Sequence, residues 1–194
     1  MDVIIDISQS KIETDRLILR FWQEADLDDF FEYASVAGVG ERAGWNHHES
    51  IDDSRTVLRK FILAKTEFAI VYKENGKVIG SVGLHQSWAN DDPDYAGLKL
   101  KDVGYVLSKD YWGKGIMPEA VKALIDFSFN TLNLDALTSG HSPANNQSRR
   151  VIEKCGFEYV KTSEYHYTEF EMTTVSMRYI LPNPNRQFYK QSCK

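Results

Sequence analysis

The chain has 194 residues, of which 42% are hydrophobic and 12% aromatic, and its formal net charge is −5. This length predicts one domain with a substantial core, and the composition excludes a disordered chain. The acidic balance argues against nucleic-acid binding, which needs a basic surface. Two cysteines are too few for a disulfide framework and fit a reducing compartment. Because the N-terminus carries acids where a signal peptide has bases, and no apolar run reaches the ~20 residues of a membrane span, we expect a cytoplasmic protein.

The first third of the chain predicts one strand and two helices. Residues 16–22 alternate between apolar and polar side chains, as a strand does, and residues 24–34 read as a short helix. Residues 35–48 are glycine-rich and aperiodic, which predicts a loop. Ser50 and Asp53 have the spacing of a capping box, and the helix that they open carries its apolar residues on one face.

The middle and end of the chain predict six more strands and two more helices. Strand-like runs cover 67–72 and 77–85 around Asn75-Gly76, a strong hairpin signal, and 102–108 reads as a buried strand after a polar loop. An amphipathic helix is predicted from about Pro118 to Asn130, with proline at its first position. The remaining elements are a strand over 134–142, a helix over 145–155 that stops at Gly156, and strands over 157–167 and 172–180. This order indicates a mixed α/β fold around one sheet.

The stretch "DYWGKGIMPEA" (110–120) places Gly113 and Gly115 between a buried strand and a helix. The glycines either make a tight turn or form an anion cradle with the free amides of the helix start. A P-loop would need Ser or Thr after Lys114, where Gly115 stands, and a dinucleotide fingerprint would need glycine where Pro118 stands. Both nucleotide motifs are therefore excluded, although an anion cradle is not.

Three stretches in order resemble the GNAT superfamily of N-acetyltransferases: 14–30, 103–120 and 145–157. The chain is most similar to the branch of the ribosomal-protein N-terminal (alanine/serine) acetyltransferases. The resemblance implies a mostly antiparallel central sheet of about seven strands with about four flanking helices. It also implies an acetyl-CoA cleft between two splayed central strands. It covers nearly the whole chain, so we expect an acetyltransferase domain over 1–181 and a polar tail over 182–194.

The resemblance implies acetyl-CoA as co-substrate and the transfer of its acetyl group to an amine without a covalent intermediate. The residues implied for cofactor binding are Tyr105, Val106, Leu107, Trp112, Gly113, Lys114, Gly115, Ile116, Met117 and Asn145. Asp110 stands where the superfamily has Gln or Arg. A carboxylate cannot donate a hydrogen bond to a phosphate. We therefore expect weaker or different pyrophosphate contacts.

The resemblance also implies the catalytic residues. Many relatives carry a tyrosine proton donor where this chain has Ile152, but the ribosomal branch has a serine at the position of Ser148. We expect Ser148 near the sulfur; the other interpretation is that Asn145 caps a helix and Ser148 lies in its first turn. No single base stands out, although His85 is a candidate because histidine suits proton removal near neutral pH. Glu67 and Glu164 are weaker candidates.

The amine acceptor is not identified by any motif. We expect Trp45, His47 and Trp88 to line the acceptor site. If the acids in the 85–94 loop touch the acceptor, they favour a cation. His166 and Tyr167 could also face this site. No metal is implied, because His47 and His48 are adjacent. A small-molecule amine acceptor (aminoglycoside, polyamine or amino acid) and a non-catalytic acetyl-CoA-binding module stay open as alternatives. We also expect a homodimer, since members of the branch often pair, but no nucleic-acid or membrane partner.

Overall fold

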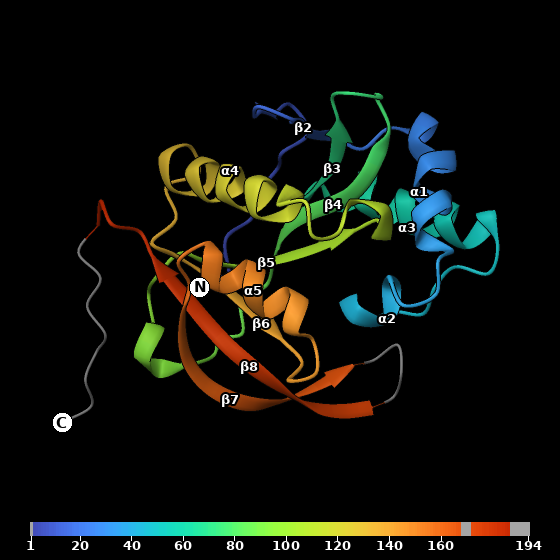
Figure 1. Cartoon of the computed structure of the whole chain (residues 1–194). Coiled ribbons are helices and arrows are strands. Elements are labelled where there is room, and N and C mark those ends of the chain that lie inside the picture. The colour runs from blue at the N-terminus through green and yellow to red at the C-terminus, as the bar shows by residue number, and fades with distance from the viewer. Residues whose placement is uncertain (1, 168–171, 187–194) are drawn as a thin grey trace.

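The computed structural model describes residues 2–167 and 172–186, which form one open sheet of eight strands in the order β1-β2-β3-β4-β5-β6-β8-β7 (Figure 1). The strands are β1 (Lys11–Glu13), β2 (Leu17–Phe21), β3 (Glu67–Tyr72), β4 (Val78–His85), β5 (Leu100–Leu107), β6 (Ala136–His141), β7 (Glu158–Tyr167) and β8 (Met172–Pro182). The helices are α1 (Leu27–Ala34), α2 (Gly40–Ala43), α3 (Ile51–Ala64), α4 (Ile116–Asn130) and α5 (Asn146–Lys154).

Every predicted strand and helix is present, and the mixed, mostly antiparallel sheet is confirmed. Two short elements were not predicted. The strand β1 has three residues, which is too few for an alternating pattern to be visible. The helix α2 has four residues and lies in the stretch predicted as a loop. Because of β1, the described sheet has eight strands instead of the expected seven or so. Because of α2, the described residues contain five helices instead of about four.

Helices cover both faces of the sheet. In β3, Phe68 and Ile70 belong to the core cluster that includes α4, whereas Ala69 and Val71 belong to the cluster that includes α1 and α3. Because successive side chains of a strand point to opposite faces, α4 lies on one face of the sheet and α1 with α3 on the other. The strand β3 is buried on both faces, which explains its near-continuous apolar sequence.

The sheet opens between β5 and β6. These two strands are parallel and pair over three positions only, from Leu100 opposite Ala136 to Asp102 opposite Thr138. Beyond this point β5 continues to Leu107 with β4 as its partner, while β6 continues to His141 beside β8. The edge of β5 from Gly104 to Leu107 therefore faces an opening instead of a strand. The predicted pair of splayed central strands is confirmed.

The structure describes only the first residues of the predicted polar tail. Asn183 and Arg186 lie in the predicted polar tail, but Asn183 is buried and donates to the carbonyl of Leu134 (2.9 Å). Arg186 forms an ion pair with Asp135, so the first residues of the tail pack on the domain. The rest of the tail, and the side chains of His166 and Tyr167, lie outside the described residues. Among the helices of the described ranges, none has the length and hydrophobicity to cross a membrane.

The predicted capping box at the start of α3 supplies a test of the local stability. The Ser50 hydroxyl accepts from the amide of Asp53, and the Asp53 carboxylate accepts from the amide of Ser50 (2.9 Å). We expect Ser50→Ala to lower the free energy of unfolding by about 1 kcal/mol, because a helix amide loses its acceptor. Urea denaturation measures this loss. Ser50→Asn, which keeps a capping oxygen, should recover most of it; equal stability of the two variants would contradict the assignment of the cap.

Candidate active site

Two glycines shape the loop that joins β5 to α4. Gly113 has φ +75° and Gly115 has φ +73°, a left-handed conformation that glycine adopts at little cost. Gly115 is the N-cap of α4, which begins at Ile116, two residues before the predicted start. Pro118 is thus the third residue of the helix, where it is tolerated because the first-turn amides have no acceptor within the helix. These amides and the helix dipole make the loop suitable for binding an anion.

The loop is held by Arg16, the residue before β2, and by the strand β5 that it follows. The Arg16 side chain donates to the carbonyl of Lys114 (2.9 Å) and, through Nε, to the Glu119 carboxylate (2.7 Å). Burial disfavours the charge on Glu119, but its hydrogen bonds to Thr14 and Arg16 outweigh this and lower its pKa. The indole of Trp112 donates to the carbonyl of Leu107 (2.8 Å). The loop therefore keeps its shape through interactions within the protein.

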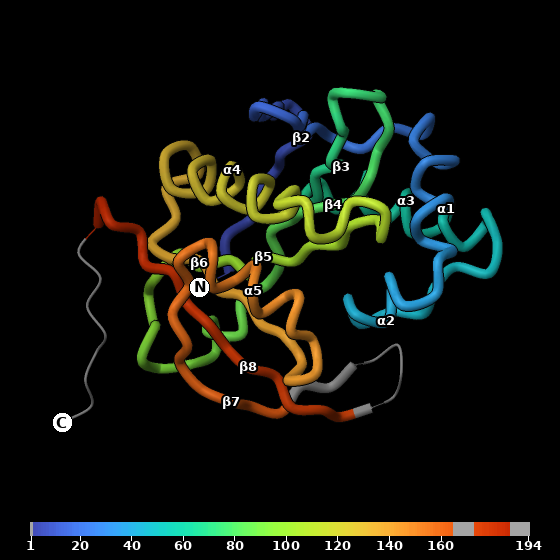
Figure 2. Tube along the Cα trace, viewed as in Figure 1, coloured from blue at the N-terminus to red at the C-terminus, as the bar shows by residue number. Residues whose placement is uncertain are grey.

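A cavity of about 330 Å³ lies between this loop and α5, which are side by side at the end of β5 (Figure 2). We call it the loop cavity. It is lined by ten of the residues predicted from the sequence: Tyr105, Val106, Leu107, Trp112, Gly113, Gly115, Ile116, Met117, Asn145 and Ser148. Lys114 is not among them, because its side chain is exposed and its Nζ lies 5.3 Å from the centre of the Tyr111 ring. The loop thus offers backbone amides to the cavity, not the Lys114 ammonium.

Asn145 and Ser148 stand at the start of α5. Asn145 is the N-cap, its Oδ1 accepting from the Ser148 amide (3.1 Å), and its Nδ2 donates to the carbonyl of Arg42 in α2 (3.0 Å). The Ser148 hydroxyl is 2.8 Å from the hydroxyl of Tyr105 on β5. Burial raises the pKa of Tyr105 well above its usual value, so its hydroxyl stays protonated. The capping role weighed from the sequence is present, and the pairing of Ser148 with Tyr105 was not foreseen.

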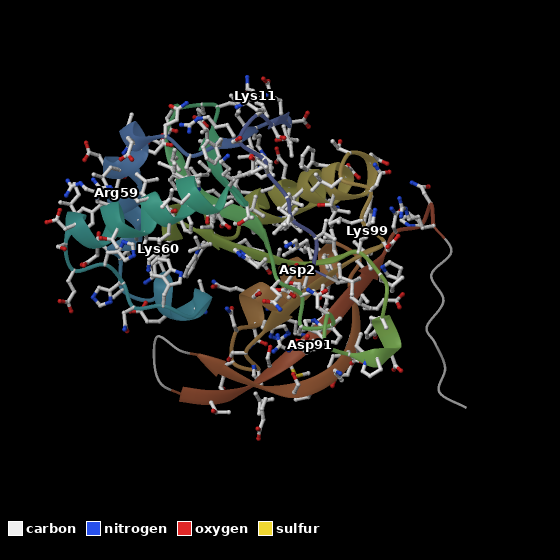
Figure 3. The ribbon with its side chains drawn as sticks, turned by 180° about the vertical axis from the view of Figure 1, so that it is seen from behind. Asp2, Lys11, Arg59, Lys60, Asp91 and Lys99 are labelled. Carbon is white, nitrogen blue, oxygen red and sulfur yellow. The ribbon has the colours of Figure 1, made fainter. Side chains whose placement is uncertain are left out.

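A second cavity, of about 1280 Å³, opens on the sheet face that carries α3. We call it the open cavity. Lys60 on α3 and Asp91 after β4 both line it and are labelled in Figure 3. The two cavities share six lining residues: Arg42, Ala43, Tyr105, Val106, Asn145 and Ser148. They therefore meet at the opening between β5 and β6, beside the Tyr105–Ser148 pair.

Three titratable side chains lie together in the open cavity. The His85 ring nitrogen Nε2 is 3.3 Å from Oε2 of Glu67, and Asp102 is the β5 register partner of His85. Burial favours the neutral ring, but the charges of Glu67 and Asp102 outweigh this and raise the pKa of His85. Burial also raises the pKa of Asp102, against its hydrogen bond from Thr138 (2.6 Å). His85 thus lies between two acids.

The predicted acceptor residues Trp45, His47 and Trp88 all line the open cavity. His47 is 2.7 Å from a Glu41 oxygen, whereas His48 is buried with Nδ1 2.7 Å from the Ser54 hydroxyl. The two adjacent histidines therefore have different partners. Within the described residues, no group of three His, Cys, Asp or Glu side chains is arranged to hold a metal ion.

Asp102 and Arg178 were not predicted as site residues from the sequence, and Glu67 was only a weaker candidate for the base. Arg178 on β8 is buried, lines the open cavity and donates to the Ser163 hydroxyl (3.0 Å). Glu67 and Asp102 each begin a run that the sequence shows as an apolar strand, "EFAIVY" and "DVGYVL". A charge at the end of such a run was the available signal, because buried charges require partners.

The raised pKa of His85 can be tested directly. We expect its pKa to lie above the ~6.5 of a free histidine, and Glu67→Gln to lower it because the neighbouring anion is lost. An NMR pH titration of the labelled ring measures both. A pKa raised by folding stabilises the fold below the unfolded-state pKa, and this contribution disappears as pH rises through the folded-state pKa. Glu67→Gln should therefore cost most stability at acidic pH. An unchanged His85 pKa in this variant, with Glu158→Gln as matched control, would contradict the interaction.

Comparison with known proteins agrees with this geometry. Residues 16–158 match the family model described as "Acetyltransferase (GNAT) domain". The chain is 38% identical to "Probable N-acetyltransferase YjcK" of Bacillus subtilis over 134 residues, 66% of this chain and 67% of that protein. It is 28% identical to "Uncharacterized N-acetyltransferase p20" of Bacillus licheniformis, over 75% of this chain and 80% of that one. A more distant relative is "Aminoglycoside N(6')-acetyltransferase type 1" of Klebsiella pneumoniae, 25% identical over 74% of this chain and 75% of that one.

Solved structures show the same fold. A GNAT-family acetyltransferase from Bacillus anthracis superposes with a TM-score of 0.76 at 20% identity, covering 89% of this chain and 98% of that one. The ribosomal-protein-S5-alanine acetyltransferase from Vibrio fischeri superposes with a TM-score of 0.69 at 21% identity, covering 92% and 99%. The microcin C7 self-immunity acetyltransferase MccE, solved with acetyl-CoA and AMP, gives 0.68 at 16% identity, covering 87% and 93%. The family match spans most of the chain and agrees with its fold, and the chain belongs to the GNAT family of N-acetyltransferases.

Proposed function

We propose that this enzyme transfers the acetyl group of acetyl-CoA to the α-amine of a protein N-terminus. The observation that carries the proposal is the junction of the loop cavity and the open cavity at Tyr105 and Ser148. A donor bound in one cavity and an acceptor bound in the other would meet at this junction. Holding two reactants in line in this way removes much of the entropic cost of a bimolecular reaction.

The residues around the loop cavity fit acetyl-CoA. The two left-handed glycines leave the backbone of the loop open, and a Cβ added at Gly113 would meet no atom within 4 Å. The amide of Trp112 donates to the carbonyl of Lys109 (3.1 Å). The amides from Gly113 to Met117 would hold the pyrophosphate, and the free edge of β5 from Tyr105 to Leu107 would hold the pantetheine arm. Asp110, on the turn before the loop, is not among the lining residues of this cavity. When bound, acetyl-CoA supplies an acetyl thioester, which is activated toward attack by an amine.

Ser148 is the proposed proton donor. Its hydroxyl lies at the junction of the cavities and is 2.8 Å from the Tyr105 hydroxyl, which burial keeps protonated. The neutral Tyr105 hydroxyl therefore holds the Ser148 side chain in place, and the proton that Ser148 gives up would be restored from solvent once the product has left. Asn145 fixes this geometry by capping the first turn of α5 through the Ser148 amide. Transfer of a positioned proton contributes about 10²- to 10⁴-fold to an enzymatic rate.

His85 is the proposed proton acceptor on the other side of the junction. An α-amine titrates near ~8, so most of it carries a proton at neutral pH and must lose it before attack. His85 lines the open cavity, and its raised pKa makes the neutral ring a stronger base. Only the neutral ring can accept, so the rate should rise as pH increases through the pKa of His85.

The size of the open cavity supports a protein terminus as acceptor. Its volume of about 1280 Å³ exceeds the ~300–1,000 Å³ of a typical small-molecule pocket. An extended peptide could lie in it with its first residue at the junction. The ribosomal-protein-S5-alanine acetyltransferase of Vibrio fischeri, similar over 92% of this chain, is named for such an acceptor.

An aminoglycoside is the second candidate acceptor. It is supported by the acids that line the open cavity, which include Glu49, Asp53, Glu67, Asp91 and Asp102. Such a lining suits a polycationic molecule. One relative, at 25% identity, is named for this activity.

We also propose a homodimer. The strand β7 is the last strand of the sheet, and Tyr159 on β7 and Val175 on β8 are exposed large apolar side chains. A second copy could cover them. Light scattering at micromolar concentration measures the mass, and a monomer would contradict this proposal.

The acceptor is tested with a peptide that begins with Ala or Ser, the same peptide with a blocked N-terminus and an internal lysine, and an aminoglycoside. We expect acetylation of the free N-terminus, detected by mass spectrometry. Ser148→Ala should lower kcat by about 10- to 100-fold and leave the KM for acetyl-CoA within about threefold, because a proton donor acts mainly in the transition state. Ser35→Ala is the matched control. Preference for the aminoglycoside would select the second candidate, and acetyl-CoA binding without any turnover would indicate a non-catalytic module.

A further inference from the structure

One oxygen of a buried carboxylate in the open cavity has no hydrogen-bond partner of good geometry among the described residues. Glu67 is 4% exposed, and among the described residues its Oε2 accepts from no donor. The nearest cationic group is the His85 ring, 3.3 Å away, which carries a charge only when protonated. A buried carboxylate without partners is costly. Since Glu67 also lines the open cavity, the partner that it lacks can come from a molecule bound there.

Two glycines make room for this carboxylate. In the sheet register Glu67 is opposite Gly83, and Gly83 is opposite Gly104. A Cβ at Gly83 would lie 1.8 Å from Glu67 Oε2, and a Cβ at Gly104 would lie 2.7 Å from the His85 ring. Side chains at either position would displace Glu67 or His85. The missing side chains therefore give room to the Glu67 carboxylate and the His85 ring, which line the open cavity beside Asp102. We call this part of the cavity wall the glycine hollow and define it by Glu67, Gly83, His85, Asp102 and Gly104.

The charges around the glycine hollow favour a cation. Glu67 and Asp102 stand on either side of His85, and both acids line the open cavity. Asp102 has a hydrogen bond from Thr138 and is attracted to Arg178 and His85. Lys101, the next residue on β5, forms an ion pair with Asp2 (2.8 Å). Asp102 thus has Arg178 as a permanent cation nearby, whereas Glu67 faces only the conditional charge of His85, and a bound cation would supply the partner that Glu67 lacks.

We propose that the glycine hollow is a binding site for a primary alkylammonium ion, in which Glu67 and Asp102 hold the acceptor amine in its charged form beside His85. The inference rests on the proposed acetyl transfer in one respect, namely that the acceptor is an amine. It goes further by assigning the recognition to charge. A small charged group with three N–H donors matches two carboxylates that line the same cavity. A neutral molecule of the same shape lacks the charge that the hollow requires.

The test uses n-butylammonium chloride as probe and n-butanol as its neutral match. Binding to the full chain, saturated with CoA, is followed by NMR at a pH where the amine is charged, using the amides of Gly83 and Gly104. We expect n-butylammonium to shift these signals in a saturable way and n-butanol to leave them in place at the same concentration. Equal binding of the alcohol would overturn the proposal, because recognition would then rest on the alkyl chain.

Variants identify the acids. Glu67→Gln and Asp102→Asn should each weaken n-butylammonium binding by about tenfold, as expected for loss of a hydrogen bond to a charged group. Glu158→Gln removes an exposed carboxylate from β7 and should change binding less than twofold. Gly83→Ala gives an independent test, because its methyl group would occupy the position of Glu67 Oε2. Unaltered binding in any folded variant of Glu67 or Asp102 would overturn the assignment of that acid.

The ammonium site and the proposed acetyl transfer can fail independently, and the experiments distinguish the two failures. Acetylation of a peptide with unaltered probe binding in Glu67→Gln would leave the acetyl transfer in place and overturn the ammonium site. Glu67-dependent probe binding without turnover on any amine would support the ammonium site and contradict the catalytic proposal. If Glu67→Gln does not fold, judged by circular dichroism, Asp102→Asn with the n-butanol comparison decides the result.

Discussion

The short pairing between β5 and β6 is the constraint on which the site depends. The two strands share three register positions and then separate, so β5 has one edge without a strand partner from Gly104 onward. A free strand edge inside a domain is unusual, because backbone groups without partners are costly when buried. Here the opening is used by both cavities. The loop between β5 and α4 follows directly from the end of β5, and α5 begins beside the same opening.

The alternation of side chains along β5 distributes the chemistry between the two faces. Tyr105 points to the face of α5, where its hydroxyl meets Ser148. Its neighbours Asp102 and Gly104 line the open cavity, with His85 above Gly104. The strand β5 thus places Tyr105 where the two cavities meet and Asp102 in the open cavity alone. A shift of the register by one residue would exchange these groups, so the pairing of β4 with β5 is part of the active site.

Most of the fold could be predicted from the sequence because its signals are local. The capping box of Ser50, the Asn75-Gly76 hairpin and the glycines before α4 each act within a few residues. The short strand β1 and the helix α2 could not be predicted, because three or four residues do not show a period. The start of α4 was misplaced because proline was assigned to the first position of the helix, where it is most common.

Site residues that are close together in the sequence could be predicted, whereas those that come together from different strands of the sheet could not. The residues predicted to bind the cofactor between Tyr105 and Met117 lie within one short stretch, so one motif indicated them, although the Lys114 side chain lies away from the loop cavity. Glu67, His85 and Asp102 come from three strands and meet only through the register of β3, β4 and β5. The contact of Tyr105 with Ser148 likewise joins residues that are 43 positions apart. Such contacts depend on tertiary packing, which no local spacing encodes.

The central claim is that the loop between β5 and α4 binds the pyrophosphate of acetyl-CoA. Calorimetric titration of the purified protein with acetyl-CoA, and with ATP and NAD as controls, tests it most directly. The account predicts micromolar binding of acetyl-CoA alone, unchanged within about threefold in Lys114→Ala, because helix-start amides and not this ammonium would make the site. Absence of acetyl-CoA binding, or equal binding of ATP, would contradict the account and reduce Gly113 and Gly115 to residues of a turn.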